Sequence, residues 1–397
     1  MGRRAAGLIA LALLVAVAAV GAWQIGGHYR FHDVWCFYHG GRAVLLHADP
    51  YDPAVWGALT ADQTYVVAGR LVAAPCPGAF AYPYWTAVAF APLALLPFDL
   101  ASLLWSIVSL AAAALGIAWC WRAAGGGPPG ITVVYGAVVL GSLAFARLVT
   151  IGQLSGVLLA LVGGLALAVR NGRPSTAGAV LGGLLLKPQL WAVLAAAVLV
   201  RSHRRGRLIA GALGVALLLA VPSLLLFPDW PLRWAGEALG HRAEMAGALP
   251  SIWSFSTELT GSPVAGGLIV AMAVVLTWAA VRGRPLSPVT IAALAIPFSL
   301  ATAPYVYTYD HLALALTWAV TCVLAARSTP SARRIVLLAL VTTASFIPWA
   351  VYVASFSAES DTPNAIAPLL AALVLALAVR LAPPASSQIG ERDGVRQ

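Results

Sequence analysis

Apolar runs about as long as a membrane is thick recur along almost the whole chain of 397 residues. A helix needs about 20 mostly apolar residues to cross the hydrocarbon layer, and within lipid every backbone polar group must be satisfied inside the chain. Charged residues make up only 10% of the sequence, against roughly 25% in soluble domains. No stretch shows the two-residue alternation of a membrane barrel. The sequence therefore predicts an all-α polytopic membrane protein.

We expect about twelve spans in one integral membrane domain, with both termini inside. Residues 5–23 follow two arginines and are interpreted as an uncleaved signal anchor rather than a cleaved signal peptide, because the run is long and more spans follow. The second span, residues 84–97, is short, and the sixth, residues 175–200, is long and contains Lys187 followed by a proline that should kink it. The expected divisions are a signal-anchor span (1–23), a first outer loop (24–82), spans 2–7 (84–227), a second outer loop (228–262), spans 8–12 (263–381) and a cytoplasmic tail (382–397).

Arginines indicate which loops face the cytoplasm, because short cytoplasmic loops carry an excess of basic residues. Residues 201–207 are the strongest marker. On this topology 15 arginines, Arg147 among them, face inside, and eight, including Arg122, Arg170 and Arg173, face outward. The loop with Arg170 and Arg173 fits worst, and merging or splitting the spans beside it would reverse the sides. The net charge of +10 is explained by topology and does not indicate nucleic-acid binding.

The first outer loop holds the strongest candidate for chemistry. Its four acidic residues, Asp33, Asp49, Asp52 and Asp62, are all aspartates, in a chain with 14 Asp and Glu. Asp33 follows the first apolar run by a few residues, where a carboxylate would lie at the mouth of a helical bundle. A loop aspartate is ordinarily structural, so a helix cap or an ion pair with Arg30 is the alternative. The other three are expected to form turns or to be solvated.

Cysteine and histidine spacing gives no sign of a metal site, since no Cys-x-x-Cys and no paired histidines with a carboxylate occur. Cys36 and Cys76 share the first outer loop and could form a disulfide in an oxidising compartment. Cys120 and Cys322 fall within expected spans. The chain has neither a Walker loop nor a dinucleotide fingerprint. No cofactor is therefore expected.

Seven features, in this order along the chain, resemble the bacterial polyprenyl-phosphate-mannose-dependent alpha-mannosyltransferases, glycosyltransferase family 87 of the GT-C superfamily. They are Asp33, the turn Ala48-Asp49-Pro50-Tyr51-Asp52-Pro53, Tyr82-Pro83 before Ala91-Pro92-Leu93-Ala94-Leu95-Leu96-Pro97, Ile151-Gly152-Gln153-Leu154-Ser155, Gly182-Gly183-Leu184-Leu185-Leu186-Lys187-Pro188-Gln189, Pro250-Ser251-Ile252, and Thr302-Ala303-Pro304 with His311. The resemblance covers about residues 28–325. The chain departs from the family where a Ser-Pro-x-Ser-Trp-x-His-His run is usual, since only His311 is kept, and where Ser155 replaces an asparagine.

The resemblance implies a GT-C bundle that moves a hexose, with mannose expected, from a polyprenyl-phosphate donor to an acceptor hydroxyl on a glycolipid or glycan. The reaction would take place among membrane lipids at the outer face of a bacterial plasma membrane. Asp33 would be the base that deprotonates the acceptor, and cationic or hydrogen-bonding groups would stabilise the leaving phosphate. The residues implied for the donor and its phosphate are His311, Arg242, Arg30, Lys187 and Gln153, with Asp310 and Tyr309 in support.

Several of these residues have structural alternatives. Asp310 and His311 could form a simple pair that fixes their helix, or Asp310 could itself be the functional carboxylate. Lys187 lies in an expected span, where a charge usually marks a cavity or pathway, but a long side chain can also extend to the interface.

Two other classes of protein remain open. A secondary transporter or a flippase of a lipid-linked or small polar substrate would also have about a dozen spans, and a membrane scaffold would need no polar cluster. No internal repeat is visible, and the two long outer loops favour a surface active site.

Overall fold

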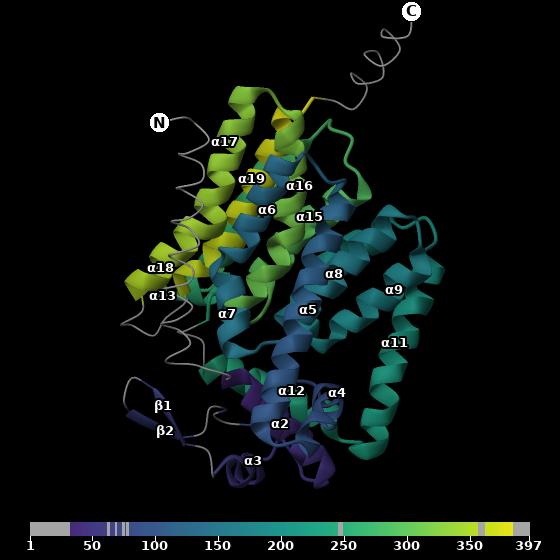
Figure 1. Ribbon diagram of the computed structural model, residues 1–397, viewed down its shortest axis with the longest axis vertical. Coiled ribbons are helices and arrows are strands. Elements are labelled where there is room, and N and C mark those ends of the chain that lie inside the picture. Colours follow the sequence, from purple (N-terminus) through teal and green to yellow (C-terminus); the bar gives the residue numbers. More distant parts are fainter. Residues whose placement is uncertain are drawn as a thin grey trace, which may run out of the picture.

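The computed structural model describes residues 32–61, 64–67, 70–73, 76, 79–244, 249–355 and 362–383. Helices make up most of these ranges, and the long ones stand together over a group of short elements (Figure 1). The bundle consists of α5 (Phe98–Ala124), α6 (Pro129–Leu140), α7 (Leu143–Ile151), α8 (Ser155–Arg170), α9 (Pro174–Gly183), η2 (Leu184–Leu186), η3 (Pro188–Leu190), α10 (Ala192–Arg201), α11 (Arg205–Leu226), α13 (Ile252–Thr260), α14 (Val264–Val281), α15 (Pro288–Thr302), η4 (Thr308–Leu314), α16 (Ala315–Arg327), α17 (Pro330–Val341), the π-helical η5 (Thr342–Phe346), α18 (Ile347–Ser355), η7 (Thr362–Ile366) and α19 (Ala367–Leu381).

The group of short elements, which we name the short-helix layer, lies at one end of the bundle (Figure 1). It consists of α2 (His32–Leu45), α3 (Pro53–Thr60), the antiparallel strands β1 (Thr64–Val67) and β2 (Arg70–Ala73), α4 (Tyr84–Phe90), η1 (Leu93–Leu95) and α12 (Trp230–Glu244). Asp52 begins α3 as its N-cap, because its carboxylate accepts hydrogen bonds from the backbone N–H groups of Ala54 and Val55 at 2.8 and 3.1 Å. A disulfide between Cys36 and Cys76 ties α2 to the segment after the strands. The pairing that was open from the sequence is therefore present.

The bundle has the lengths and composition of a membrane domain. Among the described residues, six continuous helical stretches are long and apolar enough to cross a bilayer, or seven if the pair α6 and α7, bent by 52°, counts as one span. Four shorter apolar helices, residues 155–170, 174–186, 192–201 and 288–302, complete the bundle. These findings confirm the expected all-α polytopic class. The expected first span lies outside the described residues.

The expected second span is wrong. Residues 84–97 form the seven-residue helix α4 followed by the turn η1, and seven residues extend only about 10 Å as helix, far short of a hydrocarbon layer about 30 Å thick. Pro92 and Pro97 interrupt the apolar run, because proline lacks the N–H that continues a helix. The aromatic and apolar residues of this segment were interpreted as a membrane span. In the structure they belong to a short helix, α4, that packs against α2 in the short-helix layer.

The expected sixth span is also not a single crossing. Pro188 stops the helix, and the chain passes from α9 through η2 and η3 into α10. Arg173 and Pro174 at the start of α9 line the same cavity as Arg201 at the end of α10 and Arg204 before α11. Residues 174–201 therefore enter the bundle and return to the end from which they came. Lys187 lies at the turning point.

Arginines gather at the bundle end opposite the short-helix layer, which we call the arginine end. Two neighbouring cavities there share Val169 and Pro288 in their walls. The arginines that line the first are Arg170, Arg284 and Arg327, and those that line the second are Arg173, Arg201 and Arg204.

Four arginines lie at the end of the bundle opposite to the one expected from the sequence. Arg170 donates to the carbonyl oxygens of Arg122 and Ala123, so Arg122, Arg170 and Arg173 share an end with residues 201–204 rather than facing the opposite way. Arg147 lies on α7, whose C-terminal end reaches α2. Counting α4 as a span reversed the expected side of every loop after it, and counting residues 175–200 as a single crossing reversed the sides back. Only the loops between these two segments were therefore assigned to the wrong side.

Candidate active site

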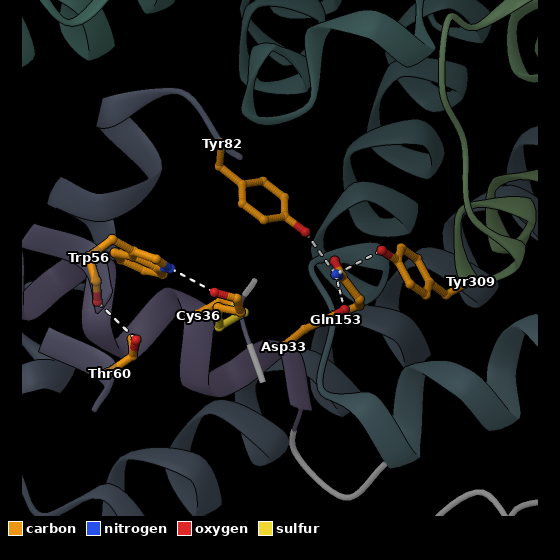
Figure 2. Close-up of a disulfide and its surroundings, with 8 residues drawn as sticks. Asp33, Cys36, Trp56, Thr60, Tyr82, Gln153 and Tyr309 are labelled. Atoms are coloured by element: carbon orange, nitrogen blue, oxygen red, sulfur yellow. Dashed lines mark hydrogen bonds between the residues drawn. A yellow bond between two sulfur atoms is a disulfide. The ribbon is translucent and has the colours of Figure 1, made fainter. Parts of the chain in front are cut away.

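Asp33 and Gln153 meet where α2 approaches the break between α7 and α8. Gln153 donates a hydrogen bond from its amide nitrogen to Oδ2 of Asp33 (Figure 2). Asp33 lies in the first turn of α2 and is half-buried. Gln153 is fully buried and belongs to neither α7 nor α8. The structure therefore brings the expected base and an expected donor-binding residue into direct contact.

The break that presents Gln153 depends on Gly152. Its φ of +78° lies in the left-handed region that favours glycine, and a Cβ at this position would collide with Val34 of α2. Helix α5 secures the break, because Trp105 donates to the Gly152 carbonyl at 2.6 Å and Ser109 to that of Gln153 at 3.3 Å. This close approach places α2, and Asp33 with it, against the amide of Gln153.

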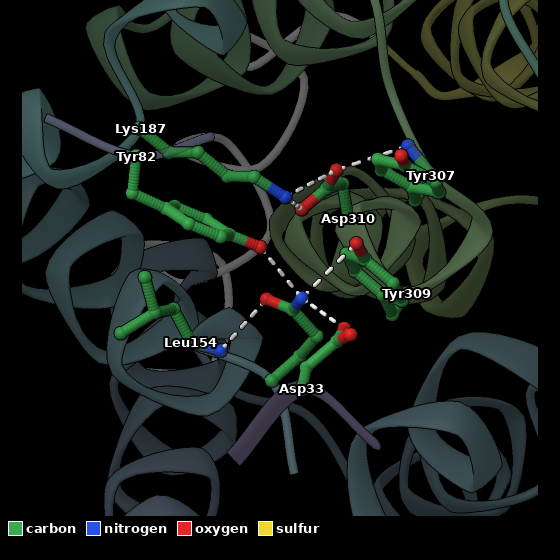
Figure 3. Close-up of polar contacts among 8 residues, drawn as sticks. Asp33, Tyr82, Leu154, Lys187, Tyr307, Tyr309 and Asp310 are labelled. Atoms are coloured by element: carbon green, nitrogen blue, oxygen red, sulfur yellow. Dashed lines mark hydrogen bonds and ion pairs between the residues drawn. The ribbon is translucent and has the colours of Figure 1, made fainter. Parts of the chain in front are cut away.

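Two tyrosine hydroxyls also surround the Gln153 amide nitrogen, Tyr82 at 2.8 Å and Tyr309 at 3.0 Å (Figures 2 and 3). An amide –NH₂ has two hydrogens, so the three oxygens around it cannot all receive one at the same time. Burial raises the pKa of Tyr82, and the nearby charge of Asp33 raises it further. The Tyr82 hydroxyl therefore stays protonated at neutral pH and can act as a donor beside the Asp33 carboxylate.

Lys187 and Asp310 form a buried ion pair next to this cluster. The Lys187 Nζ lies 2.7 and 2.8 Å from the two carboxylate oxygens of Asp310 (Figure 3), and the two side chains are 2% and 0% exposed. The backbone N–H of Tyr307 also donates to Asp310, at 3.0 Å. Lys187 thus extends neither to solvent nor to an interface, and the carboxylate of Asp310 is engaged by Lys187.

Aromatic rings connect the ion pair to the Asp33–Gln153 contact. The Lys187 Nζ lies 4.7 Å from the ring centre of Tyr309, and the ring of Tyr307 stacks on Tyr309 with centres 5.1 Å apart. A cation within about 6 Å of a ring centre is attracted by its electron-rich face. Tyr309 therefore contacts both groups, with its ring against Lys187 and its hydroxyl against Gln153. The two polar pairs form one continuous cluster.

His311 lies on another side of η4. It lines a cavity of about 10 Å³ with Ser142, Thr308 and Trp318, and its Nε2 makes no hydrogen bond with the described residues. Asp310, which could have paired with His311, pairs with Lys187 instead.

Other expected site residues are outside the part that can be described. Arg30 and Asp62 lie outside the described residues, and Arg242 lies in α12 with a side chain that also lies outside them. The loop aspartates that are described have structural roles: Asp52 caps α3, and Asp49 pairs with Arg233 of α12 at 2.7 Å.

Sequence reasoning missed Tyr82, Tyr307 and Trp105 as parts of the site. The sequence drew attention to Tyr82 only as part of the Tyr82-Pro83 motif. Its position before Pro83, at the entrance to a helix too short to cross, was the available signal. Trp105 gave none, because a tryptophan within a long apolar run is ordinary in a membrane helix.

Comparisons with known proteins identify a family and a similar solved structure. The model of glycosyltransferase family 87 matches residues 80–304 of the chain. No curated protein matches it. The crystal structure of ArnT from Cupriavidus metallidurans bound to undecaprenyl phosphate is similar at 17% identity and a TM-score of 0.42, over 93% of this chain and 76% of that one. The family match includes Gln153 and Lys187 and leaves out Asp33 and Asp310.

Proposed function

Because the chain belongs to glycosyltransferase family 87, we propose that this membrane glycosyltransferase moves a hexose, mannose in the first instance, from a polyprenyl-phosphate donor to a hydroxyl of a glycolipid or glycan. The observation that carries the proposal is the contact between Asp33 and Gln153. It places a half-buried carboxylate at the junction of the bundle and the short-helix layer, where a lipid-linked substrate and a polar acceptor can meet.

In the proposed reaction Asp33 is the base. The acceptor hydroxyl loses its proton to the Asp33 carboxylate while its oxygen bonds to the anomeric carbon of the sugar. The bond from that carbon to the phosphate oxygen breaks, and polyprenyl phosphate leaves with the electron pair. Gln153 orients the carboxylate by donating to Oδ2, which leaves the rest of the carboxylate to accept the proton.

Tyr82 and Tyr309 are proposed to position Gln153 rather than to act as bases. Tyr82 keeps its proton because burial and the Asp33 charge raise its pKa. Lys187 and Asp310 hold η4 against the turn between α9 and α10, since they neutralise each other at 2.7 Å. Their role in donor binding is thus to fix Tyr309, whose ring contacts Lys187 and whose hydroxyl contacts Gln153.

The leaving phosphate needs cationic or hydrogen-bonding groups to stabilise its developing charge. We assign this role to Arg30, Arg242 and His311. His311 can take part only if donor binding opens its small cavity, because its Nε2 is buried among Ser142, Thr308 and Trp318. No metal site is part of the proposal.

The site is proposed to face the periplasm or cell exterior of a bacterial plasma membrane. The arginine end would lie in the cytoplasm, because basic residues accumulate in cytoplasmic loops. The Cys36–Cys76 disulfide in the short-helix layer supports this orientation, since disulfides persist in oxidising compartments.

Purified full-length protein incubated with radiolabelled polyprenyl-phosphate mannose and a crude envelope glycolipid fraction tests the proposal. Transfer of label to the acceptor fraction is the expected result. Movement of label across proteoliposomes without transfer would contradict it and support the flippase alternative.

A further inference from the structure

Three arginines surround one cavity at the arginine end. The cavity has a volume of about 440 Å³ and lies where α5, α8, α16 and α19 end and α15 begins. Arg170, Arg284 and Arg327 line it, and no Asp or Glu is among the described residues of its wall. Three positive charges around a shared space repel one another. A bound anion would remove that repulsion.

The guanidinium groups converge rather than point apart. A Cβ placed on Gly125 would lie 3.6 Å from Nη2 of Arg327 and 3.9 Å from Nη1 of Arg170. Both arginines therefore reach the same point of the chain at the end of α5. Ordering two long side chains at this point costs conformational entropy.

Most of the donors in this cluster remain available. Arg170 donates to the last carbonyl groups of α5, and Arg284 donates to the carbonyl groups of Arg380 and Ala382 at 2.8 and 3.3 Å. A guanidinium has five N–H donors, so each keeps several for a ligand. The side chain of Arg327 makes no hydrogen bond or ion pair with the described residues.

Helix α15 adds a further favourable feature, because its N-terminus forms part of the wall. Ser287 caps the helix by accepting from the Thr290 N–H at 3.1 Å, and Pro288 occupies the first turn. Helix N-termini carry a partial positive charge and attract phosphate groups. Deeper in the cavity the wall is apolar, formed by Val320, Val323 and Val379.

We propose that this cavity binds the phosphate of an anionic membrane lipid through Arg327, Arg170 and Arg284. The apolar wall suits the glycerol and the first carbons of an acyl chain, and basic pockets between membrane helices are suited to such headgroups. The site lies at the opposite end of the bundle from the short-helix layer, whose helix α2 contains Asp33 (Figure 1). It is separate from the proposed sugar transfer and does not depend on it.

Native mass spectrometry of the full-length protein, titrated in detergent with phosphatidylglycerol and with phosphatidylcholine, tests the proposal. Wild-type protein should retain phosphatidylglycerol in preference to phosphatidylcholine. Arg327→Gln should weaken retention of phosphatidylglycerol about tenfold, because it removes a cationic hydrogen-bond donor. Unlike Arg170 and Arg284, Arg327 does not use its side chain to bind carbonyl groups at the helix ends.

Two matched variants remove one positive charge from the same end. Arg334→Gln lies outside both cavities, and Arg173→Gln lies in the neighbouring one. Both should bind phosphatidylglycerol as wild type does. Equal binding by Arg327→Gln and wild type, or a larger loss in Arg173→Gln, would overturn the assignment.

A competition arm distinguishes the lipid from a soluble phosphate ester. Glycerol 1-phosphate at millimolar concentration should fail to displace phosphatidylglycerol, because it lacks the carbons that contact the apolar wall. Full displacement would overturn the lipid assignment, although the phosphate chemistry would remain.

Discussion

At the scale of single residues, the proposed site depends on the contact between Asp33 and Gln153. Asp33 was recognisable as a loop carboxylate near an apolar run, and Gln153 as a polar residue behind a glycine. Their hydrogen bond joins residues 120 positions apart, and one sequence carries no sign of that contact. It exists because the left-handed Gly152 lets α2 approach. His311 was chosen by resemblance, and the structure places its Nε2 in a small separate cavity.

Replacing Gln153 with leucine should lower turnover by about 10- to 100-fold, because the Asp33 carboxylate loses the donor that orients it and small misplacements of catalytic groups cost about that much. Gln189→Leu is the matched control, since Gln189 lies in η3 and not at the break between α7 and α8 that presents Gln153 to Asp33. Steady-state transfer by the two purified variants measures the difference. Equal turnover would show that Asp33 needs no orientation by Gln153.

The pH dependence of transfer should not report ionisation of Tyr82. Burial and the Asp33 charge raise the pKa of Tyr82, so the folded protein favours the protonated hydroxyl. The contribution of this group to folding stability is therefore complete below the unfolded-state pKa of about 10 and is lost only as the pH rises above that value. Tyr82→Phe should therefore change the rate without changing the shape of the profile between about pH 7 and 9. An alkaline decline in the wild type that is absent from Tyr82→Phe would contradict this.

At the scale of elements, apolar length predicted the long helices well, and it failed where a helix is interrupted. The six long stretches correspond to expected spans, whereas α4 and the returning pair α9–α10 do not. Hydropathy alone does not reveal these cases, since the turn between α9 and α10 is as apolar as a span except at Lys187 and Gln189. The physical reason for the turn is Pro188 together with a lysine that is buried only because Asp310 neutralises it.

The ion pair provides a test of this arrangement. Lys187→Met leaves the buried carboxylate of Asp310 unpaired and should lower the free energy of unfolding by about 3–5 kcal/mol. The double variant Lys187→Met, Asp310→Leu should recover much of that loss, because neither charge is then buried alone. Thermal unfolding of the variants in one detergent provides the comparison. Equal stability of the single variant and the wild type would show that the pair does not hold the turn.

At the scale of the whole molecule, charge gives the orientation once the crossings are known. Arg122, Arg170 and Arg173 were expected outside, and the structure places them at the arginine end with residues 201–204. The assigned crossings between residues 84 and 201 were wrong, and this error misplaced the three arginines. Which helices return cannot be read from composition, because a returning pair and a single span contain the same residue types.

Accessibility labelling tests the orientation. A single cysteine at Arg173 or at His203 should be protected from an impermeant maleimide in intact cells, whereas one at Ala54 in α3 should react, because the arginine end is proposed to face the cytoplasm. The native cysteines give little background, since Cys120 and Cys322 are buried. Labelling at position 173 with protection at 203 would restore the original twelve-span topology.

The central claim is that Asp33 is the base of the transfer reaction, and its most direct test is the turnover of Asp33→Asn. Asparagine keeps the size of the side chain and an oxygen that Gln153 can contact, but it cannot take the acceptor's proton. We expect turnover to fall by about 10²–10⁴-fold while binding of the polyprenyl-phosphate donor is retained.

Asp49→Asn and Asp52→Asn are the controls, because these aspartates pair with Arg233 and cap α3. They should keep most of the activity when the variants are compared at equal amounts of monodisperse protein. Near-normal turnover of Asp33→Asn in the same assay would contradict the claim and direct the search to Asp310.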